Sequence, residues 1–290
     1  MNLRKVGQLL QETFKEWQAD KASRIAAALA YYTVFSISPL LVIAIAIAGT
    51  IFGGESAQAK ITEQLIGLVG QDGMKPILQA LDNMNQPKVK GLASLISIGV
   101  LIIGASGIFA QLQDALNTVW NVKPQPGQGI LPFLRKRLLS FLMVFAIGIF
   151  LIFSLILSTA VTTISSYQTN FLPGSVVLWE NLDFLVSFGL LTFLFCLMFK
   201  YVPDVKIAWK DVFVGSIITT LLFMFGKFLL GLYISKGSLG SAYGAAGSLI
   251  IFLAWVYYSA QIVLLGAEFT QVYTRLYGSK VRARKHSKID

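Results

Sequence analysis

Charged residues are absent from long stretches of this 290-residue chain, and these stretches set its organisation. No charge occurs between Arg24 and Glu55, which leaves thirty uncharged residues. A helix of that length measures about 45 Å at 1.5 Å per residue, enough to cross a bilayer core and both headgroup layers. We predict a membrane span here. Its first half is rich in small residues that suit helix packing, and Pro39 predicts a kink in the middle.

Five further apolar segments predict five more spans. They cover residues 91–110, 138–162, 176 or 183 to 200, 212–234 and 245–268. Two other segments are amphipathic instead. Residues 3–17 predict a short helix that either lies in the membrane interface or packs on cytoplasmic loops. Residues 55–90 predict two short helices on the far membrane surface, separated near Gly70 and Gly73.

The composition supports a polytopic membrane protein. The chain is 55% hydrophobic and 13% charged, with a mean hydropathy of +0.68, which is too apolar for a soluble domain of this length. We expect one α-helical membrane domain over residues 1–290: a cytoplasmic interfacial helix (1–24), a six-span bundle (25–270) and a basic cytoplasmic tail (271–290). The first 24 residues carry charges throughout, so we expect no cleavable signal peptide.

Basic residues orient the predicted spans. The segments expected inside hold eighteen Lys and Arg residues and those expected outside hold five, with Lys227 within a span. This bias predicts that both termini are cytoplasmic. Anionic lipid headgroups also explain the net charge of +10 more simply than nucleic acid does. We therefore expect membrane lipids as partners and no nucleic acid, and self-association into a homo-oligomer stays open.

Several motifs resemble those of the YihY/virulence factor BrkB family of bacterial membrane proteins. They are DKASRIAAALAYYTVFSISPLL near the start, FAQLQDALNTVW at 109–120, the KYVPD connection, FGKFLLGLYI at 225–234 and YGAAGSLIIFLAWVYYSAQIVLLGAEFTQVY at 243–273. The resemblance implies a six-helix protein of the cytoplasmic membrane. Family members have carried the labels serum-resistance factor, ribonuclease BN and, in one branch, transporter linked to export of a lipid A precursor.

Lys227 stands out because a lysine within a span costs about 2.5–3.5 kcal/mol on insertion scales. Its side chain either snorkels to the outer headgroups or faces a cavity that accepts an anionic headgroup. The candidate cavity residues are Lys227, Tyr32, Asp183 and Tyr243. For the tyrosines, packing or a place in the interfacial aromatic belt is the simpler interpretation.

A second group of polar residues is predicted near the inner membrane surface. Gln111, Asp114 and Asn117 recur at a spacing that places them on one helical face. Glu268 ends the last span, and basic residues near it could pair with it. The candidates for this inner polar cluster are Arg24, Gln111, Asp114, Asn117, Arg137 and Glu268. A network that locks helix ends explains them as well as a substrate site does.

The sequence shows no catalytic constellation. The single histidine, His286, lies in the basic tail, and no carboxylate set is spaced like a metal site. We predict no catalytic residues, no metal and no cofactor. The predicted function is non-enzymatic transport or handling of a lipid-like or anionic amphipathic substrate. The alternatives are a structural component that organises partners and, less favoured, the ribonuclease of the old family label.

Overall fold

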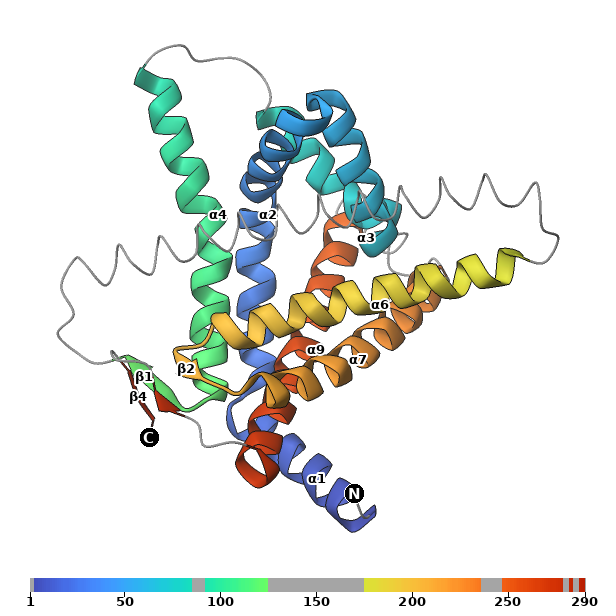
Figure 1. The fold of residues 1–290 in the computed structure, drawn as a ribbon. Helices are drawn as coiled ribbons and strands as arrows, with labels where there is room; N and C mark the ends of the chain where they lie inside the picture. The colour runs from blue at the N-terminus through green and yellow to red at the C-terminus, as the bar shows by residue number, and fades with distance from the viewer. Residues whose placement is uncertain are drawn as a thin grey trace.

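The computed structural model describes residues 3–84, 92–124, 175–235, 247–278, 282–283 and 287–289, and these are mostly helical (Figure 1). Helix α1 (Leu3–Ala19) leads through a tight turn into α2 (Ala22–Phe52), which is followed directly by α3 (Gly54–Met84). Lys21 in that turn has a positive φ of 54°. Gly53 joins α2 to α3 with a φ of 82°, a conformation that glycine adopts without strain.

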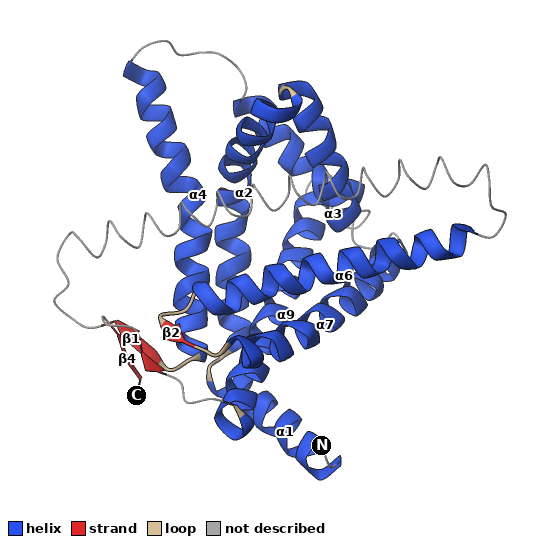
Figure 2. Cartoon of the chain, in the orientation of Figure 1, coloured by secondary structure: helices blue, strands red, loops and turns tan. Residues whose placement is uncertain are grey.

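The other elements follow in two blocks. Helix α4 (Leu92–Val119) is followed by strand β1 (Val122–Pro124). Helix α6 (Ser175–Tyr201), strand β2 (Val205–Lys206) and helix α7 (Trp209–Ser235) form the next block, and α9 (Gly247–Tyr277) precedes two short strands, β3 (Arg282–Ala283) and β4 (Ser287–Ile289). Strand β1 pairs with β4 and β2 pairs with β3, both antiparallel, so the C-terminal strands are joined to two connections between helices (Figure 2).

Helix α9 is the centre of the arrangement. It packs against α1, α2, α3 and α7, while α2 also packs against α4, and α6 against α7. In the view of Figure 1, α6 and α7 run together across the direction of α2 and α4. The main core lies where α2, α4, α6, α7 and α9 meet, around Leu116, Phe199 and Leu264, which are fully buried.

Threonines and glycines bring α7 and α9 into close contact. A Cβ atom added at Gly215 would lie 1.8 Å from the Thr270 hydroxyl oxygen, and one added at Gly266 would lie 2.0 Å from that of Thr219. Each threonine donates its hydroxyl hydrogen to the glycine carbonyl four residues earlier on its own helix, at 2.8 Å for Thr219 and 2.6 Å for Thr270. The hydroxyls are therefore satisfied without water, which suits a helix pair inside a membrane.

Helix α2 contains the predicted kink. Its segments Ala22–Ile37 and Pro39–Ile45 meet at 50°. Ser36 donates a hydrogen bond of 2.7 Å to the Gly104 carbonyl of α4, and a Cβ at Gly104 would lie 3.1 Å from the Pro39 ring. The bend thus packs against a glycine of the neighbouring helix.

Within the part of the chain that the structure describes, three helical segments are long and apolar enough to span a membrane: Phe184–Tyr201, Trp209–Leu232 and Gly247–Tyr277. The two segments of α2 add a fourth if they are counted as one bent span. The predicted span at 138–162 lies outside the described residues, so six spans stay a prediction. Helix α9 continues beyond Glu268, where the sixth span was expected to end.

The segment after the first span also differs from its prediction. Helix α3 is continuous through Gly70 and Gly73, where two helices were expected. A glycine inside a helix costs only about 1 kcal/mol relative to alanine. Burial of Ile61, Met74 and Ile77 in a cluster shared with α2 and α9 offsets that cost.

Candidate functional site

The first candidate site is a narrow groove between α7 and α9, which we call the Lys227 groove. It is open to the surface, with about 160 Å³ of space that includes its solvent-exposed mouth, and is lined by Phe223, Lys227, Leu230, Trp255, Tyr258, Ser259 and Ile262. Lys227 is exposed and contributes the only charge to this lining. Its carbon stem can lie along the aromatic side chains while the ammonium stays accessible.

Glycine explains how the groove forms. A Cβ at Gly226 would lie 2.3 Å from the Tyr258 hydroxyl oxygen, so only glycine lets that ring approach α7 so closely. Phe223 meets Trp255 edge to face, with ring centroids 6.4 Å apart. These contacts hold α7 and α9 together beside Lys227. Among the side chains that the structure describes, none forms an ion pair with Lys227.

The second candidate site is a set of hydrogen bonds around Asp204, in the connection between α6 and α7. Asn117 of α4 donates to the Asp204 carboxylate at 3.1 Å and accepts a 2.8 Å hydrogen bond from the Asp204 backbone amide. Gln113 donates to the same carboxylate at 3.3 Å. Because Asn117 is only 4% exposed, these bonds fasten α4 to the connection.

The third candidate site lies where α1 and the α1–α2 turn meet α9. Glu268 is 1% exposed, and neither of its carboxyl oxygens has a hydrogen-bond donor among the described residues. The Asp20 carboxyl is within hydrogen-bonding reach of it. Two ionised carboxylates cannot bond to each other, so a bond forms only when one carries a proton.

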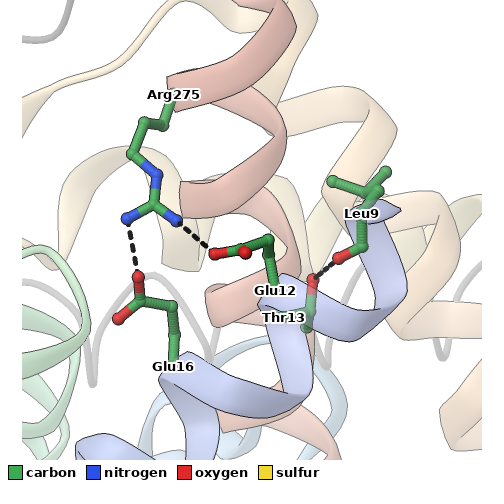
Figure 3. A network of polar contacts seen from close by, with 5 residues as sticks. All are labelled: Leu9, Glu12, Thr13, Glu16 and Arg275. Carbon is green, nitrogen blue, oxygen red and sulfur yellow. Dashed lines mark hydrogen bonds and ion pairs between the residues drawn. The ribbon is translucent and has the colours of Figure 1, made fainter. Parts of the chain in front are cut away.

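Arg275 of α9 holds α1 in place beside this pair. Its guanidinium nitrogens lie 2.6 Å from Glu16 Oε1 and 3.5 Å from Glu12 Oε2 (Figure 3). One helical turn away, Thr13 donates to the Leu9 carbonyl at 2.8 Å, and Leu9 packs against Phe269 and Val272. Helix α1 therefore docks on α9, while Leu10 and Phe14 stay exposed on its other side.

The remaining predicted site residues are dispersed. Tyr32 is exposed on α2, with its ring edge-on to Tyr31 at 5.9 Å. Arg24 and Asp114 are exposed, and Gln111 is half-buried. Asp183 belongs to α6 but its side chain is not among those described, and Tyr243 and Arg137 lie outside the described residues. Of the predicted inner cluster, the structure thus places Asn117 and Glu268 in two separate polar sites.

Sequence reasoning missed Gln113, Asp204 and Asp20 as parts of these sites. Gln113 and Asn117 are four residues apart on α4, a spacing that could have suggested a shared partner. Asp204 belongs to the KYVPD motif, which points to it without naming its partner. Among the described residues, no group of three or more His, Cys, Asp or Glu side chains is arranged to hold a metal ion.

The comparison with known families decides the identification. The family model described as Virulence factor BrkB matches residues 13–289, almost the whole chain. The chain belongs to the BrkB family. The match covers α2, α4, α7 and α9. It therefore includes all three candidate sites, apart from the residues of α1 that precede residue 13.

Curated relatives of this BrkB-family chain are bacterial membrane proteins. It is 26% identical to a UPF0761 membrane protein of Acinetobacter baylyi over 96% of this chain and 64% of the relative. It is 28% identical to one of Ralstonia nicotianae, over 92% of this chain and 58% of the relative. The chain spans about three-fifths of the length of these relatives, whose names state no reaction. No solved structure matches.

Proposed function

We propose that this protein binds an anionic amphipathic molecule in the bacterial cytoplasmic membrane and takes part in its transport, without catalysis. The observation that carries the proposal is the exposed Lys227 within a candidate span, beside a groove lined by aromatic side chains. A lysine in hydrocarbon is costly unless an anion or water stabilises it, and such residues often mark substrate paths.

The shape of the groove limits what it can hold. The groove has no enclosed room for even a water-sized sphere, so it cannot enclose a ligand. A single anionic group such as a phosphate or carboxylate would therefore lie at its open mouth, beside Nζ of Lys227. Apolar tails would extend outside it. A phospholipid-like molecule has this combination of parts.

The proposed orientation has both termini in the cytoplasm. Eighteen of the basic residues then lie in inside segments, and Lys227 lies in the half of α7 nearer the outer surface. Trp209 and Tyr201 at the inner end are exposed, contact each other edge to face at 6.0 Å and suit the headgroup layer. The Lys200 ammonium lies 5.2 Å from the centroid of the Trp209 ring.

Bromine-labelled lipids test the groove because Trp255 lines it. The full-length protein is placed in vesicles of brominated phosphatidylglycerol or brominated phosphatidylcholine, and fluorescence quenching of Trp255 is obtained by difference from a Trp255→Phe variant. One lysine near an anionic surface contributes about 1 kcal/mol, so we expect about a fivefold preference for phosphatidylglycerol at this position.

Two lysine variants make the test specific. Lys227→Met should abolish the preference, while Lys210→Met removes an exposed charge from the same helix outside the groove and should preserve it. Equal quenching by both lipids in the wild-type protein would contradict headgroup binding at Lys227. The structural role, in which the bundle organises partners, would then be the better explanation.

A further inference from the structure

Glu268 presents an electrostatic problem that the Lys227 groove does not address. It is among the largest fully buried side chains, and its carboxyl oxygens have no donor among the described residues. An ionised carboxylate in that position would lose its hydration without compensation, which costs several kcal/mol. The neutral acid avoids most of this cost, and it also supplies a hydrogen that can be donated to a neighbour.

Asp20 is that neighbour. It lies in the α1–α2 turn, beside Lys21 with its left-handed backbone, and its carboxyl is within hydrogen-bonding reach of Glu268. Burial raises the pKa of the Asp20 carboxyl, and the nearby Glu16 carboxylate adds to the rise, whereas the hydrogen bond with Glu268 opposes it. The geometry is that of two carboxyl groups that compete for one proton.

The surrounding charges favour retention of that proton. Helix α1 presents Glu12 and Glu16, and Arg275 of α9 is already engaged by both (Figure 3). The guanidinium that lies closest to the pair is thus already shared by two carboxylates. Among the described residues, the basic groups at the adjoining helix ends, Lys21 and Arg24 of α2 and Lys210 of α7, form no ion pair with Glu268. Asp114 of α4 and Asp211 of α7 would carry the same sign as Glu268.

Two unpartnered indole groups lie in the same part of the core. Among the described residues, Trp17 Nε1 and Trp120 Nε1 are buried without an acceptor. Both rings pack with the cluster that contains Ala267, the residue before Glu268. The region therefore contains buried hydrogen-bond donors as well as buried acceptors. Such groups can hold ordered water by hydrogen bonds.

We propose that Asp20 and Glu268 share one proton and form a proton-binding site, and that loss of this proton releases the α1–α2 turn from α9. Protonated, the pair joins the turn to α9 by a hydrogen bond. Deprotonated, it places two carboxylates side by side next to Glu16. The Arg275 contacts, the packing of Leu9 and Trp17 and the contact of Lys5 with the Tyr277 ring then oppose separation. The site is separate from the Lys227 groove, since Ile262, the groove residue on α9 that is nearest in sequence, lies about 9 Å from Glu268 along the helix at 1.5 Å per residue.

Infrared spectroscopy detects the proton directly. The full-length protein in lipid nanodiscs is titrated from pH 5 to pH 9, and the carbonyl stretching band of a protonated carboxyl group is followed. We expect this band at neutral pH, its loss on titration to alkaline pH, its absence at neutral pH in Glu268→Gln, and its loss at a lower pH than in the wild type in Asp20→Asn, where no like charge faces Glu268. Glu63→Gln, which removes an exposed carboxyl from α3, serves as the control and should keep the band.

A distance measurement tests the mechanical consequence. Spin labels at Gln11 on α1 and Leu276 on α9, in a Cys196→Ser background, report their separation by pulsed electron resonance. We expect one short distance at pH 5 and an added longer distance at pH 9, with the short distance alone at both pH values in Glu268→Gln. A wild-type protein without the infrared band at neutral pH would overturn the proposal even if every variant failed to fold. A distance shift at pH 9 that persists in Glu268→Gln would overturn the coupling.

Discussion

The contact of Gly266 with Thr219 gives a prediction about how α7 and α9 are held together. In Gly266→Ala the new Cβ would lie 2.0 Å from the Thr219 hydroxyl oxygen, and 2.8 and 2.9 Å from its Cβ and Cγ2. Ordinary contact begins near 3.4 Å, so the atoms must separate by about 1.4 Å. Thr219 cannot simply turn away, because its hydroxyl is bonded to the Gly215 carbonyl at 2.8 Å.

The cost follows from two opposing effects. Overpacking of a core costs about 1–3 kcal/mol, and the upper end applies here because the clash meets a stiff β-branched side chain. Alanine regains about 1 kcal/mol of helix propensity over glycine, which leaves a net loss of about 2 kcal/mol. Gly231→Ala on α7 is the matched control, since no atom lies within 4 Å of its Cβ position. It should be neutral or stabilising by up to about 1 kcal/mol.

The free energy of unfolding is measured on purified protein in detergent by titration with dodecyl sulfate, with helical circular dichroism as the signal. The expected difference of about 3 kcal/mol between the two variants is roughly a hundredfold in the folding equilibrium constant. Thr219→Ala should be less harmful in the Gly266→Ala background than alone, with a coupling of at least about 0.5 kcal/mol. If Gly266→Ala were as stable as Gly231→Ala, the reasoning about this helix contact would be refuted.

Three further predictions concern the other sites and the orientation. Asn117→Ala should cost about 1–3 kcal/mol in unfolding free energy, because it leaves Asp204 without two of its hydrogen bonds, while Gln11→Ala on the exposed side of α1 should change little. The raised pKa of Asp20 means that the folded protein binds this proton more tightly than the unfolded chain does. The contribution of the proton to stability is therefore complete below about pH 3.8 and declines as the pH rises through the raised pKa. The pH dependence of thermal unfolding should accordingly be weaker in Asp20→Asn. Single cysteines in a Cys196→Ser background should react with an impermeant thiol reagent on intact cells at Ser56 and not at Ser287, and the opposite result would reverse the proposed orientation.

Much of the helical framework could be predicted from local sequence. Uncharged runs gave three candidate spans with nearly correct limits, since charges such as Lys200 and Asp211 mark where apolar helices leave a membrane. The kink at Pro39 followed from a missing backbone donor. Breaks at glycine were less reliable, because α3 continues through Gly70 and Gly73 where its buried face is held by α2 and α9.

The partners of polar residues could not be predicted in the same way. Asn117 bonds to Asp204, which is 87 residues away, and no local pattern defines that distance. For Glu268 the sequence left open an exposed carboxylate and a basic partner, yet it is buried beside Asp20, because α1 turns back at Lys21 and lies against α9. Such partners depend on how helices are aligned, and a hydrophobic pattern gives only which side of each helix is apolar.

The alignment of α7 with α9 is nevertheless encoded in small residues. Gly215 meets Thr270, Thr219 meets Gly266, and Gly226 meets Tyr258. The two residue numbers add to 485 in the first two pairs and to 484 in the third, as expected for antiparallel helices in one register. That register places Lys227 beside Tyr258, and it places Glu268 opposite residue 217. Lys227 and Glu268 therefore lie at different levels of the helix pair, Lys227 in the groove between α7 and α9 and Glu268 beside the α1–α2 turn.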